Sequence, residues 1–382
     1  MKKILDFSTF INEGLDHSGV NSYQLAFLRR TVDGKWSVNE KGKIDVMGNV
    51  IVRLQSTSLP VEFGEVSGNF IFHKCKHLKT LKGSPEVVGG DFSCLDAESL
   101  ESLEGAPRKV GKSFNCQSCE SIKTFEGAPL EIGENFEAKF CYKLTSLKGA
   151  PEVIPGTFDI GQCTSLTSLE GSPRKVGKHF QALHSASLVT LEGGPEEVGG
   201  EFAVVGCVKL TSLEHSPQKV GSFSCTGIRD LLTLKGAPAE VPGGFHCNSC
   251  GKLKNLEGAP RKVGIHFLCN SNESLESLEG GPEEVGGDFS CAWNVKLVTL
   301  KGSPETVGGT FAAHDNPSLV AILGATKDAS DYNFSRCPKL IDDEQELLKH
   351  KDLIKDYLNS GLSIEDFLHK KRGTIKGQEF GF

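Results

Sequence analysis

The sequence lacks a hydrophobic run long enough to cross a membrane. No apolar stretch approaches the roughly 20 residues that a membrane helix requires. The first residues, MKKILDFSTFINEG, also lack the continuous apolar core and the small-residue cleavage site of a secretion signal. We therefore expect a cytoplasmic protein with no membrane partner.

The sequence also lacks an excess of basic residues. Lys and Arg together number 42 against 49 Asp and Glu, which gives a net charge of -7 and a pI near 5.9. A surface that follows a phosphate backbone needs clustered and unbalanced cations. Nucleic acid is therefore not expected as a partner.

Signs of catalysis are missing as well. The recurring phrase GxPxxVGG does not introduce a helix, as a phosphate-binding loop does. Only about 45 residues follow Cys337, and no His or Asp stands beside it as a partner for a catalytic thiol. We expect no enzyme and no cofactor.

Glycine is abundant, at 44 residues, and it recurs inside a repeated phrase. The same wording returns every 22 residues, as in LKTLKGSPEVVGGDFSC, LESLEGAPRKVGKSFNC and LESLEGGPEEVGGDFSC. A phenylalanine column runs through Phe70, Phe92, Phe114, Phe136, Phe158, Phe180, Phe202, Phe223, Phe245, Phe267, Phe289 and Phe311. Every step in this column is 22 residues, except for a step of 21 residues between Phe202 and Phe223.

The repeat predicts a mainly β solenoid of about twelve coils over residues 44–340. The F-x-C pattern has the period of a strand, whereas the Gly- and Pro-rich L-x-x-L-x-G-x-P part cannot form a helix. We therefore expect one short strand and an irregular return in each coil, with the strands forming one parallel sheet. The Phe column, the residue two after it, the Val88 column and two Leu columns should point inward, because a 22-residue unit buries its apolar face only by stacking.

The two ends predict caps for the core of the solenoid. Residues 1–43 contain a short helix over SYQLAFLRR, and Trp36 is expected to cover the first coils. Residues 341–382 predict a helix over DDEQELLKHKDLIKDYLNSG and a second helix over SIEDFLHKK, followed by a tail. Ser363 and Asp366 form a capping-box-like start for the second helix.

The residue five after each Phe is most often Cys or Asn. Cys occurs in the first part of the chain, for example at Cys119 and Cys141, and Asn272, Asn294 and Asn316 follow later. This alternation resembles leucine-rich repeats, in which such a side chain satisfies the backbone of the turn after the strand. The wording SLEGAPRKVG is also similar to repeat proteins encoded by large tailed phages. The resemblance implies a protein-binding solenoid but names no partner.

The motifs CQSC, residues 116–119, and CNSC, residues 247–250, invite a metal or redox interpretation. Twelve of the thirteen cysteines lie two or five residues after a column Phe, so each motif is two columns of the repeat that carry Cys in one coil. The two motifs are six coils apart and cannot share one tetrahedral zinc ion. Core packing of free thiols is favoured, while a local metal site and disulfides remain alternatives.

Two surfaces are expected from the remaining positions. Residues after the proline alternate in charge between neighbouring coils, as in Glu152 and Arg174, which would help to fix the register. The positions next to the strand vary, and a position that folding does not constrain is a candidate for binding. We expect anchors for a partner at Phe140, Leu183, Val205, Leu268 and Trp293, with His179, His246 and His266 nearby.

These features predict a non-enzymatic protein-binding module, and the resemblance implies one that is encoded by a phage and acts on a host protein. The alternative is a structural component or assembly scaffold of a virion. Neutral variation of the outward positions, or their packing against the coil, would explain the same pattern without any partner. A metal cluster among the dispersed histidines is not expected.

Overall fold

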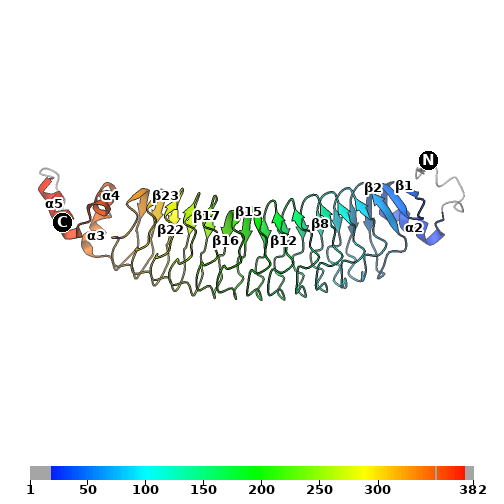
Figure 1. Cartoon of the computed structure of the whole chain (residues 1–382), viewed down its shortest axis with the longest axis horizontal. Helices are drawn as coiled ribbons and strands as arrows, with labels where there is room; N and C mark the ends of the chain where they lie inside the picture. The colour runs from blue at the N-terminus through cyan, green and yellow to red at the C-terminus, as the bar shows by residue number, and fades with distance from the viewer. Residues whose placement is uncertain (1–18, 349–350, 375–382) are drawn as a thin grey trace. The chain divides into compact units, whose positions relative to one another are not determined.

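The structure is a computed structural model that describes residues 19–348 and 351–374. It is a β-solenoid of about 13 turns of roughly 22 residues, in which the strands of successive turns pair in parallel. Contacts divide the chain into two compact units, Met1–Lys209 with Glu214–Val220, and Leu210–Leu213 with Gly221–Phe382. Within each unit the turns stack on one another (Figure 1), which confirms the predicted fold class.

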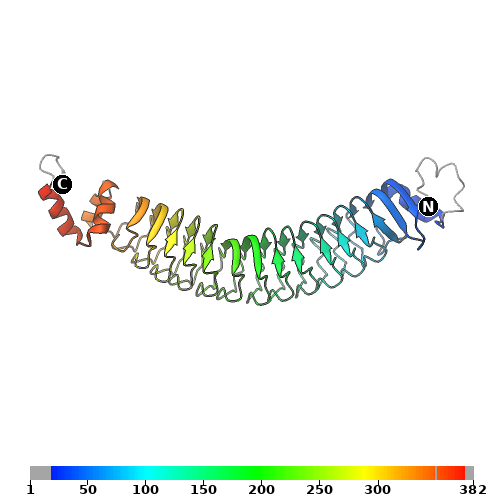
Figure 2. The same ribbon diagram turned by 45° about the horizontal axis from the view of Figure 1, so that its top comes forward.

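The strands form two rows, and in Figure 2 they lie along one side of the stack in each unit. We number positions in a coil from the phenylalanine column, position 0. Strands at position 0 are β4 (Phe70–Phe72), β6 (Phe92–Ser93), β8 (Phe114–Asn115), β10 (Phe136–Glu137), β12 (Phe158–Asp159), β14 (Phe180–Gln181), β18 (Phe245–His246), β20 (Phe267–Leu268) and β22 (Phe289–Ser290). Strands of the preceding row are β3 (Phe63–Val66), β5 (Val87–Val88), β7 (Lys109–Val110), β9 (Glu131–Ile132), β11 (Val153–Ile154), β13 (Lys175–Val176), β17 (Glu240–Val241), β19 (Lys262–Val263) and β21 (Glu284–Val285). Among the coils after Phe70, four longer strands join the two rows: β15 (Glu197–Ala203), β16 (Lys219–Ser224), β23 (Thr306–Ala312) and β24 (Asp328–Asn333).

The expectation of one strand per coil was wrong, because the valine before the glycines forms a second one. Two glycines separate the strands, as Gly89 and Gly90 do between β5 and β6. A Cβ at Gly89 would lie only 2.3 Å from the carbonyl oxygen of Ser67 in the preceding coil. Close approach of neighbouring coils explains these glycines, and a two-residue strand is too short to show a period in the sequence.

The core consists of the columns that the repeat predicted. All position-0 phenylalanines are fully buried, as are the Val88 column and the two Leu columns almost throughout. The rings stack along the solenoid: Phe92 and Phe114 lie 5.4 Å apart between centroids with their planes 2° apart, and Phe267 and Phe289 lie 5.4 Å apart at 7°. Each such ring buries on the order of 150–250 Å², so the ladder supplies much of the apolar burial.

The glycine after the second leucine takes a left-handed backbone conformation. Gly83 and Gly105 both have φ of 92°, a region that residues with a Cβ resist. His215, the exception in this column, has φ of 66°. The turn therefore keeps its conformation even where the sequence departs from glycine.

The N-terminal cap forms as expected. Helix α2 (Ser22–Thr31) begins with a capping box between Asn21 and Gln24, and it leads into the antiparallel strands β1 (Val32–Val38) and β2 (Ile44–Val52). Trp36 is only 3% exposed. β2 then pairs in parallel with β3 and β4, which starts the stack.

One more coil follows the twelve that the phenylalanine column marks. Tyr332 on β24 pairs with Phe311 on β23, so that tyrosine takes position 0 after a step of 21 residues. Cys337 is then at position +5, and its thiol donates to the carbonyl oxygen of Ala313 at 3.2 Å. The sequence pattern left Cys337 outside both cysteine columns because the step is short and the Phe is replaced.

The C-terminal cap consists of helices α3 (Asp342–Leu347), α4 (Lys351–Ser360) and α5 (Ile364–Thr374). The single helix predicted over 342–361 is thus assigned as two, with residues 349 and 350 between them outside the described part. Ser363 caps α5, since its hydroxyl accepts the Asp366 N–H at 3.1 Å and donates to the Asp366 carboxylate at 2.8 Å. Residues 375–382, the end of the predicted tail, lie outside the described residues.

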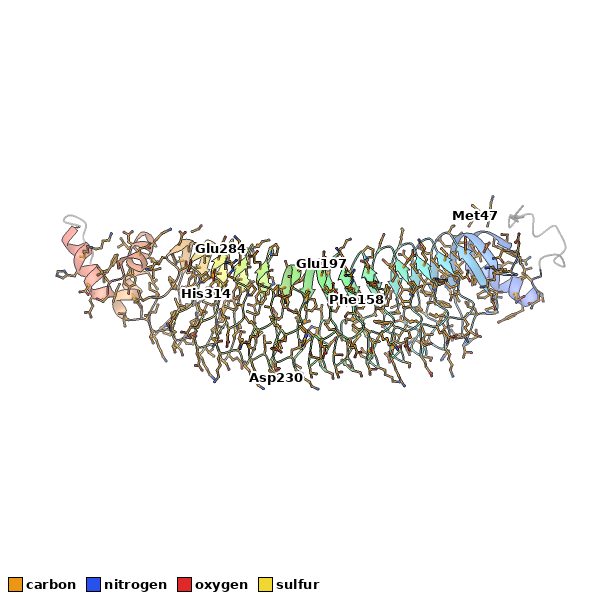
Figure 3. The ribbon with its side chains drawn as sticks, in the orientation of Figure 1. Met47, Phe158, Glu197, Asp230, Glu284 and His314 are labelled. Carbon is orange, nitrogen blue, oxygen red and sulfur yellow. The ribbon has the colours of Figure 1, made fainter. Side chains whose placement is uncertain are left out.

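The alternating charges pair between coils, as expected. Arg174 lies 3.1 Å from the carboxylate of Glu152 and 3.3 Å from that of Glu196. In the second unit Lys262 lies 2.8 Å from the carboxylate of Glu284. Figure 3 shows Glu284 on the side of the strands and Asp230 on the opposite side, among the turns. Such exposed pairs contribute up to about 1 kcal/mol each and favour the correct register over slipped ones.

Candidate protein-binding surface

The residues predicted to bind a partner fall at four positions of the coil. His179 and His266 are at -1, His246 and Leu268 at +1, Leu183 and Val205 at +3, and Phe140 and Trp293 at +4. Strands at position 0 end at +1 in most coils, so the residues at +3 and +4 lie in the turn that follows and not on the sheet. The predicted residues therefore line two neighbouring surfaces.

Position -1 serves the backbone of the next coil. The Nδ1 atom of His179 accepts the N–H of Glu201 at 3.1 Å, and Nδ1 of His266 accepts the N–H of Asp288 at 3.1 Å. Each imidazole must be unprotonated at Nδ1 to do this. The same bond is made by Asn69, Asp91, Ser113, Asn135, Ser222 and Asp288. The two histidines are thus explained by hydrogen bonding between coils, without a partner.

Position +1 offers a shallow surface. His246 and Leu268 are neighbours in the parallel register of β18 and β20, and both side chains are half-buried. The side chains at +1 in other coils are also half-buried or buried, including Asp159, which is 4% exposed. Contacts made here alone would be small.

Position +4 has a left-handed backbone in every coil that the structure describes from Phe70 onward. Phe140 has φ of 61° and Trp293 has φ of 56°. For a residue with a Cβ this conformation costs about 1–2 kcal/mol, whereas Gly and Asn tolerate it. The residues at this position are Lys74, Asp96, Ser118, Phe140, Gln162, His184, Gly206, Gly227, Ser249, Ser271, Trp293, Asp315 and Arg336. A large aromatic residue here is therefore not required by the fold.

Trp293 is the most exposed of the predicted anchors. Its side chain is 49% exposed, whereas Phe140, Leu183, Val205 and Leu268 are half-buried. The Trp293 ring packs against His314 in the next coil, with centroids 4.5 Å apart and planes at 84°. An indole that is held on one side and open on the other is a typical anchor of protein interfaces.

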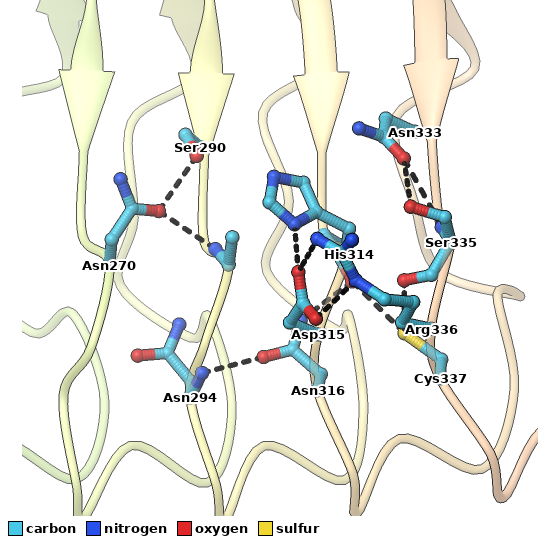
Figure 4. A network of polar contacts seen from close by, with 12 residues as sticks. Asn270, Ser290, Asn294, His314, Asp315, Asn316, Asn333, Ser335, Arg336 and Cys337 are labelled. Carbon is cyan, nitrogen blue, oxygen red and sulfur yellow. Dashed lines mark hydrogen bonds and ion pairs between the residues drawn. The ribbon is translucent and has the colours of Figure 1, made fainter.

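A polar network holds His314 in place (Figure 4). Its Nδ1 lies 2.6 Å from the Asp315 carboxylate, and the same carboxylate accepts two hydrogen bonds from Arg336, from Nε and from an Nη, each at 2.5 Å. These hydrogen bonds, first those from Arg336 and then that from His314, lower the pKa of Asp315 to about 2. The carboxylate is therefore ionised at neutral pH, and Trp293 rests on a rigid support. We call Trp293, His314, Asp315 and Arg336 the tryptophan corner.

A smaller aromatic pair lies in the first unit. The rings of Phe140 and Tyr142 are 6.3 Å apart between centroids at 70°, and Tyr142 is 40% exposed. Lys139 beside them pairs with the buried carboxylate of Asp159 at 2.9 Å. Neither ring of this pair is as exposed as that of Trp293.

Sequence reasoning missed Arg336 and Tyr142. Arg336 is at position +4 of the coil of Tyr332. The sequence signal for this extra coil is Cys337, because a cysteine at position +5 places Tyr332 at position 0. Tyr142 lies at position +6, two residues after +4, the last of the predicted binding positions. No sequence signal distinguishes it from other exposed turn residues.

The cysteines belong to the core. All thirteen are free and buried, and burial raises the pKa of Cys116 and of Cys207 to about 12. At position +5 the thiol donates to the preceding coil, as Cys141 does to the carbonyl oxygen of Cys116 at 3.3 Å. Among residues 19–348 and 351–374, no three His, Cys, Asp or Glu side chains gather as metal ligands. The sulfurs act here as small apolar groups and weak donors.

None of the helices in the described part of the chain has the length and apolar character needed to span a membrane. Comparison with protein-family models, with curated proteins and with solved structures finds no match to this chain. The resemblance to leucine-rich repeats thus depends on the repeat pattern of the sequence alone.

Proposed function

We propose that this chain is a non-enzymatic protein-binding module whose binding centre is the tryptophan corner. The observation that supports the proposal is the combination at Trp293 of large exposure with an unfavourable backbone conformation. A residue that costs stability through its backbone and leaves about half of a large side chain exposed indicates a role outside folding. The surrounding His–Asp–Arg network gives the indole a fixed position before binding, which reduces the entropy lost on association.

The form of the function that we favour is a phage protein that binds a host protein in the host cytoplasm. The repeat wording resembles that of repeat proteins of large tailed phages, and thirteen buried free thiols suit a reducing compartment. The second candidate is a structural component or assembly scaffold of a virion. That candidate predicts the chain in purified particles in stoichiometric amounts.

The proposal is tested with Trp293→Asn, which removes the indole but tolerates the left-handed backbone. We expect the variant to keep or raise the unfolding midpoint of the wild type, since asparagine relieves the cost at φ of 56°. Affinity purification from host cells with quantitative mass spectrometry should show one protein that is depleted at least about tenfold with this variant. Binding of that protein should then be reproduced with purified components.

The control is Tyr23→Ala, which removes another exposed aromatic ring, 66% exposed, from helix α2. It should leave the captured protein unchanged. Equal capture by wild type and Trp293→Asn would contradict the proposal, because folding is not at stake in that variant.

A further inference from the structure

The side chains at position +9, on the return segment of the coil, form a second exposed surface. Backbone N–H groups at this position bond to the preceding coil, as Val298 does to Glu276 and Val320 does to Val298. Side chains at +9 therefore stack about 4.8 Å apart along the solenoid. In most coils they are polar: Lys79, Glu101, Lys123, Thr145, Thr167, Thr211, Lys254 and Glu276.

Val189 and Leu232 are single exceptions between polar neighbours, whereas the last three coils depart from this pattern in succession. Val298, Val320 and Ile341 are 44%, 51% and 49% exposed, and we call them the apolar strip. Ile341 belongs to the column because Tyr332 pairs with Phe311, which places Ile341 nine residues after position 0. Leu323, three residues after Val320, is another exposed aliphatic residue, at 48%. Three consecutive large aliphatic side chains in contact with water are costly for a surface without a partner.

Cations flank the apolar strip on one side. Lys296 and Lys339 each lie two residues before a strip residue, at position +7, and both are exposed. The intervening residues, Leu297 and Leu340, point into the core, so that +7 and +9 share the outward side. No carboxylate of the described residues lies within 4 Å of either lysine, in contrast to Lys262 or Lys301 on the same unit. The strip thus offers apolar contact beside two exposed lysines.

We propose that the apolar strip binds the apolar face of an amphipathic α-helix whose flank is acidic. A helix that lies along the solenoid axis presents a side chain on one face every three or four residues, about 4.5–6 Å apart. This spacing matches the roughly 4.8 Å between coils closely enough for three successive contacts. Carboxylates beside that face would meet Lys296 and Lys339, and such pairing selects among partners and their orientations. This inference extends protein binding to a second surface and does not depend on Trp293.

The test uses a fluorescent 18-residue helical peptide with leucines at i, i+4, i+7 and i+11 and glutamates beside them. A matched peptide carries lysines in place of the glutamates. In anisotropy titrations the full-length protein should bind the acidic peptide at least about tenfold more tightly than the basic one. Val320→Asp should weaken binding of the acidic peptide by a further tenfold or more, and Lys296→Glu with Lys339→Glu should reverse the preference between the peptides.

The matched control is Val189→Asp, at position +9 of another coil and 51% exposed, with polar Thr167 and Thr211 in the neighbouring coils. It should change the affinity by less than about twofold, as should Trp293→Asn. Three results would overturn the inference: equal affinity for both peptides, equal loss with Val189→Asp, or a homodimer in light scattering that Val320→Asp dissociates. The last result would assign the strip to a second copy of the chain. Loss of the captured host protein with Trp293→Asn but normal peptide binding would keep the two proposals separate.

Discussion

Coils with Cys at position +5 and coils with Asn at the same position solve one hydrogen-bonding problem in different ways. In the first unit the thiols of Cys119 and Cys141 each donate one weak bond, at 3.3 Å, to the +2 carbonyl of the preceding coil. In the second unit the Asn294 amide donates to two +2 carbonyls, of Cys269 at 3.1 Å and of Cys291 at 2.7 Å. Its oxygen also accepts the backbone N–H of Asn272 at 2.7 Å.

The difference teaches what each residue type contributes to the stack. Where the next coil carries Cys at +5, the backbone N–H at +5 turns back to its own coil, as in Cys119 to the Cys116 carbonyl at 3.4 Å. Where the next coil carries Asn, that N–H bonds to the Asn side chain, as in Cys250 to Asn272 at 2.6 Å. A thiol therefore fills space and adds one weak bond, whereas an amide connects three backbone groups.

The largest difference in stability between the coils with Asn at +5 and the coils with Cys at +5 is expected from Asn294→Leu. The substitution keeps the number of side-chain heavy atoms but leaves the Asn272 N–H buried without its acceptor. The Cys269 and Cys291 carbonyl oxygens each lose one donor and keep another, the amides of Asn272 and Asn316. An unpaired buried N–H costs roughly 1–3 kcal/mol and a lost hydrogen bond about 0.5–1.5 kcal/mol, so we expect a loss of about 2–4 kcal/mol in the free energy of unfolding. Urea denaturation followed by circular dichroism measures it, and hydrogen exchange at Asn272 reports the local opening.

The matched control for this prediction is Cys141→Ala in the other region. It removes one weak donor and a small volume, for which about 1–2 kcal/mol is expected. A loss for Asn294→Leu no larger than that for Cys141→Ala would show that the amide ladder adds nothing over the thiols.

Much of this architecture was predictable because the repeat is explicit. The columns that face inward followed from the period alone, since a residue kept as Phe, Leu or Cys in many coils has to share one core. The second strand row and the coil of Tyr332 were not predictable in the same way. Two-residue strands have no period, and a 21-residue step with Tyr in place of Phe interrupts the pattern that defines a coil.

The candidate site was predictable only in part. Variation next to the strand drew attention to Trp293, and its exposure fits that expectation. The same criterion selected His179 and His266, whose variation reflects a shared need for an acceptor that Asn, Asp, Ser and His all meet. The direction of a backbone N–H between coils, and the left-handed conformation at +4, depend on the folded turn and leave no mark in a single sequence.

Alkaline pH is expected to weaken the coils through their buried thiols, Cys269 and Cys291 of the Asn coils included, whereas the amide side chains keep their protons. Burial raises the pKa of Cys207 from its ordinary value near 9 to about 12. Above pH 9 the unfolded chain loses this proton and the folded chain keeps it, so stability falls as pH rises, until the folded thiol ionises near 12. At pH 10.5 this one thiol should cost about 2 kcal/mol relative to pH 8.

The measurement compares wild type with Cys207→Ser at both pH values, because other groups titrate in the same range. Serine occupies position +5 naturally at Ser185, where its hydroxyl donates to the carbonyl oxygen of Ile160 at 3.3 Å. The variant should therefore fold, and its loss between pH 8 and 10.5 should be smaller than that of the wild type. An identical loss in both proteins would mean that the Cys207 thiol is not protected in the folded state.

The smallest effect concerns the corner around Trp293 and the corner around Phe140, which differ in charge at position +4. Three successive coils of the second unit carry Trp293, Asp315 and Arg336 there, whereas Ser118, Phe140 and Gln162 in the first unit carry no charge. Because the pKa of Asp315 is lowered from about 3.8 to about 2, its contribution to stability is complete above pH 4. It is lost as pH falls toward 2. Acid should therefore loosen the tryptophan corner only as pH falls toward 2.

Arg336→Gln tests this assignment, because Arg336 is the main cause of the lowered pKa. Carbon-detected NMR titration should show the Asp315 carboxyl moving up toward its ordinary range, with a residual shift from His314. Trp293 fluorescence should then change between pH 4 and 2 in the wild type and follow the higher pKa in the variant. A wild-type Asp315 that titrates near 4 would mean that the ion pair does not hold His314, and the indole would then lack the rigid support that makes it a better binding centre than Phe140.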